Sequence, residues 1–172
     1  MENQQSTVDG FRFLPPKLSA WIRTYIPEED YTGHIPFQAP RVPLERAKVA
    51  LVTTAGISMT SDPPFDMERE QTEPTWGDPT YRKIPKEAAE KDIDINHLHI
   101  NTEYVRQDIN VMLPLGRMRE FEAEGVVGGL APTSYSFYGF QWESKGFLET
   151  AIQPMADQMK AEAVDAVLLT PA

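Results

Sequence analysis

Three short apolar runs along the chain predict buried strands. The first, Lys48 to Thr53, is apolar on both faces, rich in β-branched residues and followed by Gly56. Such a run is typical of a parallel strand inside a sheet. A second run covers Val126 to Pro132, and a third covers Val164 to Thr170. We expect all three to belong to one sheet.

Two amphipathic segments predict helices between these strands. Pro114 to Gly125 has apolar residues three positions apart and ends at a glycine, a common helix stop. Lys145 to Ala163 repeats its apolar residues at helical spacing, with a bend expected near Pro154. The order strand, long loop, helix, strand, helix, strand predicts an α/β unit with right-handed crossovers. We expect a parallel-sheet, three-layer architecture of the flavodoxin- or Rossmann-like kind.

The rest of the chain divides by composition. Residues 1–46 are rich in proline and aromatic residues, so we expect an irregular arm with one short helix near Leu18 to Tyr25. Residues 47–172 form the predicted α/β domain. Within it, Ile57 to Asn110 has few helical signals and is expected to be a long irregular stretch. Long loops of this kind are often functional.

Charge and composition exclude several classes of function. The formal net charge is -10, which disfavours binding to nucleic acids and to anionic membranes. No run of eighteen or more apolar residues predicts a transmembrane helix. The sequence contains no cysteine, so it cannot itself form disulfides, thiolate metal sites or a cysteine nucleophile. Because the first ten residues are polar, we expect no secretory signal and a cytoplasmic protein.

Polar residues follow the predicted strands where a ligand site is expected. In parallel α/β sheets, ligands bind beyond the carboxyl ends of the strands. Gly56 is either an anion cradle of backbone N–H groups or a plain turn. The segment from Thr133 to Gly139 is predicted to be a hydroxyl-rich loop that faces a substrate or packs against a partner. The substrate-binding candidates at these strand ends are Thr53, Thr54, Gly56, Ser134, Tyr135 and Thr170.

The long middle stretch contributes further polar candidates. Arg82 is either a surface residue or a bidentate partner for a substrate carboxylate. His97 and His99 would share one face of a strand. They could be hydrogen-bonded loop residues or a metal pair without an identified third ligand. Proton transfer near pH 7 by His97 is the better functional alternative.

Acidic and amide residues flank the predicted helix and the first loop. Asp62 and Asp66 are interpreted as turn residues. Asn110 is suited to support the start of the helix that begins near Pro114. Asp108 and Asn110 are also retained as substrate-binding candidates. No metal-ligand spacing is recognisable in the sequence.

Several of these segments resemble, in order and spacing, the motifs of one protein family. The resemblance extends from about Ala47 to the last residue. The motifs are Lys48-Val-Ala-Leu-Val-Thr-Thr-Ala-Gly56, Gly77-Asp-Pro-Thr-Tyr-Arg82, Ile84-Pro85, His97, Asp108-Ile-Asn110, Pro114-Leu, Arg117-Met-Arg-Glu120, Glu124-Gly-Val126 and Ala131-Pro132. The family that they resemble is the selenoprotein B family of glycine, sarcosine and betaine reductases, together with the selenocysteine subunit of D-proline reductase.

The resemblance implies a reaction. In the family, the strand resembling Val164 to Thr170 leads into selenocysteine, or cysteine in relatives. Its selenolate attacks the α-carbon of a small amino-acid-like substrate such as D-proline, glycine or betaine, and a C–N bond α to a carboxylate is cleaved reductively. A companion subunit bearing a pyruvoyl group is thought to activate the amine. By this analogy, Arg82 or the turn at Thr54 to Gly56 would hold the carboxylate, and His97 would handle a proton.

The sequence departs from the family pattern at its end. It has no cysteine and no residue after Ala172, where the nucleophile would follow. A selenocysteine codon treated as a stop, a deliberate truncation and a natural split subunit are competing explanations, and we favour the first. No cofactor is then expected in this chain, and its catalytic activity alone should be absent. An incomplete sheet would expose an edge, so we expect a homo- or hetero-oligomer.

Two other functions remain open at the sequence level. The chain could be a non-catalytic binding or assembly subunit, with the proline-rich arm gripping a partner. It could also be an enzyme that needs no thiol and uses His97 or Asp108 as its acid or base.

Overall fold

The computed structural model describes residues 10–24, 38–73 and 75–172 and separates the chain into two compact units. The first unit, residues 1–38, contains a 3-10 turn at Gly10–Phe13 and helix α1, Pro16–Arg23. The helix was predicted to begin two residues later. Residues 25–37 of the predicted arm lie outside the described residues. Residues 39–46, also assigned to the arm, belong to the second unit, where Gly128 donates its N–H to the carbonyl of Leu44 at 3.0 Å.

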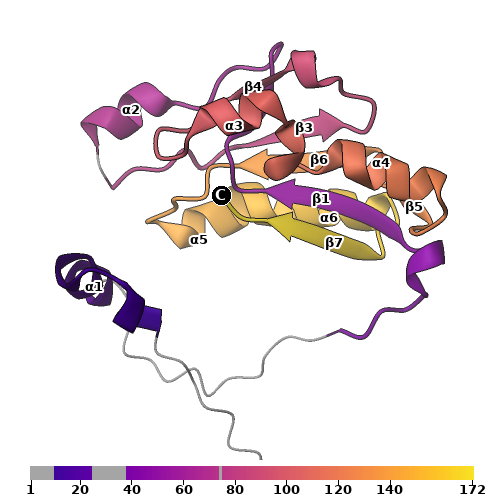
Figure 1. Ribbon diagram of the computed structural model, residues 1–172, viewed down its shortest axis with the longest axis horizontal. Helices are drawn as coiled ribbons and strands as arrows, with labels where there is room; N and C mark the ends of the chain where they lie inside the picture. The colour runs from indigo at the N-terminus through magenta and orange to yellow at the C-terminus, as the bar shows by residue number, and fades with distance from the viewer. Residues whose placement is uncertain (1–9, 25–37, 74) are drawn as a thin grey trace, which may run out of the picture. The chain divides into compact units, whose positions relative to one another are not determined.

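The second unit is built around a mixed sheet with strand β1 at its centre (Figure 1). β1, Lys48–Thr53, pairs in parallel with β7, Ala166–Thr170, along one edge. Its other edge takes β5, Gly129–Leu130, and then β6, Thr133–Phe137, both parallel. β3, Tyr81–Pro85, completes the sheet antiparallel to β6. The expected α/β class with mostly parallel strands is confirmed.

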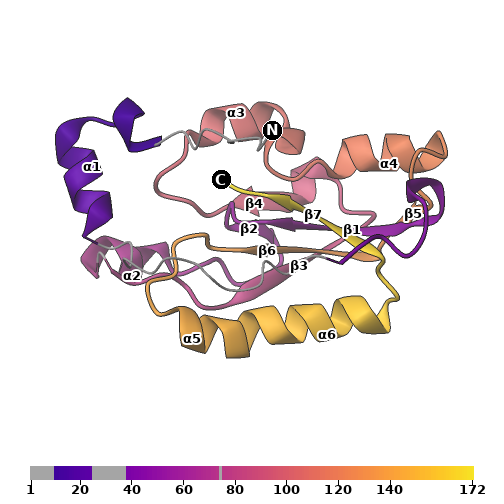
Figure 2. The same ribbon diagram turned by 90° about the horizontal axis from the view of Figure 1, so that it is seen from below.

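Helices cover both faces of this sheet (Figure 2). One face carries α3, Thr102–Gln107, and α4, Leu115–Ala123, with a 3-10 turn at Ile109–Val111 between them. The other carries α5, Ser144–Phe147, and α6, Gln153–Ala161. A π-helical segment, Leu148–Ile152, joins α5 and α6 just before Pro154, where a bend was predicted.

The alternation of side chains along β1 supplies the core on both faces. Val49 and Leu51 are buried with residues of α3 and α4, whereas Val52 is buried with residues of the α5–α6 side. Successive side chains of a strand point to opposite faces, so a strand that is apolar throughout requires cover on both sides. The run from Lys48 to Thr53 therefore predicted its own central position.

The second strand begins later than the sequence predicted. Only Gly129–Leu130 of the Val126 to Pro132 run is a strand, and the predicted loop from Thr133 onwards is strand β6. Pro132 lacks an N–H to donate and separates the two strands. The hydroxyl residues suggested a loop, but Ser136 is buried, because β6 pairs with β1 and with β3 at once.

The middle stretch is more regular than predicted. It contains β2, Ile57–Met59, paired antiparallel with β4, Ile93–Ile95, and also helix α2, Met67–Thr72. A 3-10 turn, Glu90–Asp92, precedes β4, and another, Leu44–Arg46, precedes β1. Each element here is three to six residues long, and hydrophobic periodicity is measurable only over longer windows.

Strand β7 forms where predicted, but its burial was predicted wrongly. Val167, Leu168 and Leu169 are 43%, 39% and 68% exposed. Within the described residues, β7 pairs with β1 alone and so forms an edge of the sheet. Its apolar residues point to both faces of the sheet, which is typical of an internal strand.

No helix among the described residues is long and apolar enough to cross a membrane.

Candidate functional site

The carboxyl ends of β1, β6 and β7 meet at Thr54. Its N–H donates to the carbonyl of Thr170 at 3.2 Å, and its carbonyl accepts from the N–H of Gly139 at 3.1 Å. Its hydroxyl oxygen accepts from the N–H of Ala172 at 2.8 Å. One residue thus contacts the segments that follow both neighbouring strands. Parallel α/β sheets bind ligands at such an edge.

The turn after β1 uses its backbone donors inside the protein. The N–H groups of residues 54–57 donate, in order, to the carbonyl of Thr170, the hydroxyl of Thr53, the carbonyl of Phe137 and the hydroxyl of Ser136. An anion cradle requires N–H groups that converge on the ligand instead. The structure therefore supports the plain-turn interpretation, in which Thr53 is a buried residue that fixes the turn.

Gly56 allows the middle loop to approach this turn. Its φ is +62°, and a Cβ at this position would lie 2.4 Å from the carbonyl oxygen of Asn96. Asn96 donates its N–H to the carbonyl of Gly56 at 2.9 Å and its Nδ2 to the hydroxyl of Ser58 at 2.8 Å. Only glycine fits here without a shift of the backbone. The loop carrying His97 is therefore held directly beside the end of β1.

His97 lies against the residue that follows β6. Its ring stacks on Tyr138, with 4.8 Å between centroids and 24° between planes, and Tyr138 forms a bridge with Ala55. Burial lowers the pKa of His97, and the Glu70 carboxylate opposes this effect. His97 and His99 lie in a loop rather than on a strand, and their rings are perpendicular at 6.1 Å. Within the described residues, no group of three or more potential ligands supports the metal alternative.

Glu70 is a site residue that the sequence interpretation missed. It lies on α2, its side chain is only 6% exposed, and its Oε1 is 2.9 Å from Nε2 of His99. Burial raises the pKa of Tyr138, and nearby Glu70 raises it further. The signal that could have revealed α2 is Asp66, which caps the helix by accepting the N–H of Arg69 at 2.9 Å. An aspartate before an acidic first turn is a helix start signal.

Arg82 is fully engaged with the neighbouring loop. Its Nε donates to the carbonyl of Pro63 at 2.9 Å, and its Nη2 donates to that of Pro64 at 3.2 Å. Nη1 donates to the hydroxyl of Thr80 at 2.8 Å, and the guanidinium lies over Phe65 at 4.3 Å. Arg82 thus fastens the 62–66 loop to β3. Binding a carboxylate in a bidentate way would require it to release these carbonyls.

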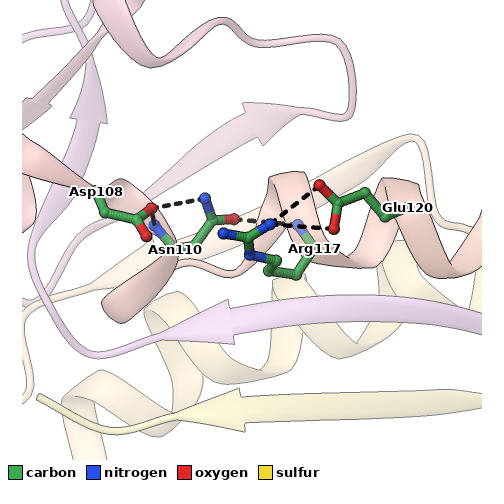
Figure 3. A network of polar contacts seen from close by, with 4 residues as sticks. All are labelled: Asp108, Asn110, Arg117 and Glu120. Atoms are coloured by element: carbon green, nitrogen blue, oxygen red, sulfur yellow. Dashed lines mark hydrogen bonds and ion pairs between the residues drawn. The ribbon is translucent and has the colours of Figure 1, made fainter.

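Asp108 and Asn110 form a network at the start of α4 (Figure 3). Asn110 donates its Nδ2 to Asp108 at 2.7 Å, and its Oδ1 accepts from the N–H of Arg117 at 3.1 Å. The hydrogen bonds that Asn110 donates to Asp108, from Nδ2 and from its backbone N–H, lower the pKa of Asp108. Arg117 also pairs with Glu120 at 3.1 Å. The geometry matches the helix-support role predicted for Asn110.

The remaining candidates are divided between the strand end and the core. Thr170 donates its hydroxyl to the carbonyl of Met112 at 2.7 Å, which holds the segment before α4 to the end of β7. Tyr135 is fully buried among the residues that face α6, and burial raises its pKa to about 12. Ser134 is also buried, opposite Ile84. The hydroxyl that β6 contributes to the turn is that of Ser136, which the sequence interpretation did not single out.

A mixed sheet with mostly parallel strands, covered by helices, places this protein in the broad α/β class, in which ligands commonly bind beyond the carboxyl ends of the strands. The particular family follows from sequence comparison. Residues 24–172 match the family described as glycine/sarcosine/betaine reductase selenoprotein B. The chain belongs to this family, as the resemblance predicted.

Similar proteins include subunits of two reductase complexes. The chain is 38% identical over 127 residues to D-proline reductase subunit gamma of Acetoanaerobium sticklandii, covering 74% of this chain and 49% of that protein. It is 31% identical over 150 residues to glycine reductase complex component B subunit gamma of Carboxydothermus hydrogenoformans, covering 83% and 34%. The chain thus spans half the length or less of these relatives. No solved structure matches it significantly.

Proposed function

We propose that this chain is the substrate-side part of a gamma-type reductase subunit that cleaves a C–N bond α to a carboxylate. The substrates would be small amino-acid-like molecules such as D-proline, glycine or betaine. The observation that carries the proposal is the convergence of the ends of β1, β6 and β7 on Thr54, in a chain that belongs to a reductase family. A companion subunit would complete the enzyme.

The chain's own residues have distinct roles in this proposal. The Thr54 hydroxyl, which accepts a hydrogen bond from Ala172, still has its own O–H to donate to a substrate carboxylate. The His97 ring, fixed by its stacking on Tyr138, lies beside the same turn, and the loop that carries His97 and His99 supplies the group that handles a proton. Thr53, Gly56 and the backbone of Thr170 keep the turn in place.

The family's selenocysteine, or a cysteine in its place, fits this edge of the sheet. The backbone at Ala172 is tied to Thr54, so a nucleophile that follows the β7 strand in sequence would be delivered beside the proposed carboxylate contact. A selenolate or thiolate supplies the attack on the α-carbon when it is present. The pyruvoyl group would belong to the companion subunit.

Restored activity tests the proposal. The chain would be extended after Ala172 with selenocysteine or cysteine and the corresponding second half of the D-proline reductase gamma subunit, then combined with companion subunits. We expect thiol-dependent release of an amine, or ring opening, from at least one of D-proline, glycine, sarcosine and betaine. The matched control carries alanine in place of the nucleophile and should be inactive. Absence of cleavage for all four substrates would contradict the proposal.

Exposed apolar residues favour a second candidate, a non-catalytic assembly subunit. Leu169 on β7 is 68% exposed, and Phe13 and Trp21 in the first unit are also exposed. Apolar and aromatic residues are enriched at protein interfaces. Deleting residues 1–38 should weaken co-elution with the companion subunits in size-exclusion chromatography if the first unit grips a partner. Unchanged co-elution would contradict the proposal that the first unit grips a partner.

A further inference from the structure

Four side chains form a connected cluster beside the turn after β1. Glu70 pairs with His99, the N–H of His99 donates to Nδ1 of His97 at 3.0 Å, and His97 stacks on Tyr138. Tyr138 in turn lies 3.2 Å from where a Cβ of Gly56 would be. The cluster therefore joins α2 and the 96–101 loop to the end of β1.

The hydrogen bond to Nδ1 fixes the tautomer of His97. A neutral imidazole carries one N–H and one lone pair, and the nitrogen that accepts a hydrogen bond supplies the lone pair. Because Nδ1 accepts from the backbone of His99, the proton of neutral His97 is on Nε2. Its half-buried ring favours the neutral form. His97 can therefore donate a hydrogen bond through Nε2, whereas the lone pair on Nδ1 already accepts from the backbone of His99.

The pairing with Glu70 fixes the tautomer of His99 and leaves a lone pair on its Nδ1. A buried carboxylate is an acceptor, so the neutral His99 ring donates its Nε2–H to Oε1 across 2.9 Å. The lone pair is then on Nδ1. The His99 side chain is 68% exposed, whereas that of Glu70 is 6% exposed. His99 is therefore the exposed member of the pair and has its lone pair on Nδ1. Glu70 is the buried member, and its carboxylate orients the His99 ring.

We propose that His99 is the proton acceptor of this site, that Glu70 is its positioning residue, and that His97 is a neutral hydrogen-bond donor. The inference rests on the proposed function. For a substrate whose ammonium group carries an N–H, such as D-proline or glycine, His99 Nδ1 takes one proton from that group, and the N–H electron pair remains on the amine nitrogen. The imidazolium that forms is balanced by the Glu70 carboxylate. No electrons are transferred in this step.

The tautomers can be read directly without any enzyme activity. Imidazole ¹⁵N shifts of the full chain, recorded at pH about 9 where imidazoles are neutral, should show both rings protonated at Nε2. E70A removes the acceptor and should leave His99 as a mixture of tautomers. E70Q keeps an acceptor oxygen and should restore the single tautomer. E73A is the matched control, because Glu73, directly after α2, pairs with exposed Arg69 of that helix, and it should leave the spectrum unchanged.

Two spectral results would overturn the assignment. One is protonation of His99 at Nδ1 in the wild type. The other is an E70A spectrum identical to that of the wild type while E70A and E70Q both remain folded by thermal melting. E70Q keeps the shape of the side chain, so it still reports on the acceptor if E70A unfolds.

Kinetics of the restored complex test the proposed roles of His99 and His97 in catalysis. H99Q should lower kcat by about 100-fold, the lower end for a lost acid–base group, whereas H97Q should raise KM more than it lowers kcat. Wild-type kcat in H99Q would refute the role of His99. If the wild-type complex cleaves no substrate, the proposed function itself fails, while the ¹⁵N spectra still decide whether Glu70 positions His99.

Discussion

Gly56 is the residue on which the geometry of the site depends most directly. Its φ of +62° disfavours any side chain, and its neighbour is a backbone carbonyl that cannot rotate away. We expect G56A to lower the free energy of unfolding by about 2 kcal/mol or more, because strain and a clash add. Chemical denaturation measures this loss.

Gly125 provides the matched control. Its φ is +73°, but nothing lies within 4 Å of the added Cβ. G125A should therefore cost only the conformational part, about 1 kcal/mol for an L-residue held at positive φ. Equal losses for both variants would show that the contact between Gly56 and the Asn96 carbonyl is not tight.

His97 should make the fold sensitive to acid. Burial lowers its pKa in the folded state, while the unfolded chain titrates near pH 6.5. Well above pH 6.5 both states are neutral and the residue contributes nothing. As the pH falls, the unfolded state takes up the proton first, so folding is destabilised. Glu70, His99 and Tyr138 face this ring.

The decrease in Tm between pH 7.5 and 5.5 should accordingly be smaller in H97Q than in the wild type, by differential scanning calorimetry. The same pH dependence in both proteins would contradict a buried, neutral His97. The other titrating groups are common to both proteins, so the difference isolates this residue.

At the residue scale, the sequence predicted that Thr54, Gly56 and Thr170 are at strand ends but not what they contact. It also placed Ser134 and Tyr135 beyond a strand, although both lie inside β6. Thr54 and Gly56 could be located because they follow an apolar run. The sequence could not show that Arg82 donates to the carbonyls of Pro63 and Pro64, because these residues lie in a loop 19 and 18 positions away. Glu70 was not selected because its helix has only six residues, too few for hydrophobic periodicity to indicate a helix, and the cap signal at Asp66 was interpreted as a turn.

Among the elements, helix α4 depends on the Asn110 side chain for its start. Asn110 accepts from the N–H of Arg117, and Gly116 leaves room for it, since a Cβ there would lie 2.9 Å from Oδ1. N110A should lower the free energy of unfolding by about 1 kcal/mol, the usual cost of a lost cap. E120A is the control, because its ion pair with Arg117 is exposed and is worth a few tenths of a kcal/mol. Equal effects in urea denaturation would refute the capping role.

The long elements were predictable and the short ones were not. β1 and the α5–α6 region have apolar patterns sustained over whole elements, so their type followed from periodicity. β6 was assigned to a loop because its hydroxyl side chains look solvent-facing. Their burial comes from pairing with two strands that are distant in sequence, β1 and β3, and no local pattern reports that pairing.

In the whole molecule, β7 is the surface that most favours association. Its apolar residues are exposed and no strand of the described residues pairs with its outer edge, which is a template for further pairing. We expect concentration-dependent association in sedimentation velocity, reduced in L169K. V126K, at an apolar residue 40% exposed in another part of the fold, should leave association unchanged. Equal behaviour of both variants would argue against β7 as the contact.

The central claim is that substrate is bound where the strand ends meet at Thr54. The most direct test is kcat/KM for amino-acid cleavage by the restored complex carrying T54V or T150V. Thr150 has an exposed hydroxyl bonded within its own helix and serves as the control. T54V should lower kcat/KM by about 10- to 100-fold, the value of a hydrogen bond to a charged group, while T150V should not. Wild-type kcat/KM in a folded T54V complex would contradict the account.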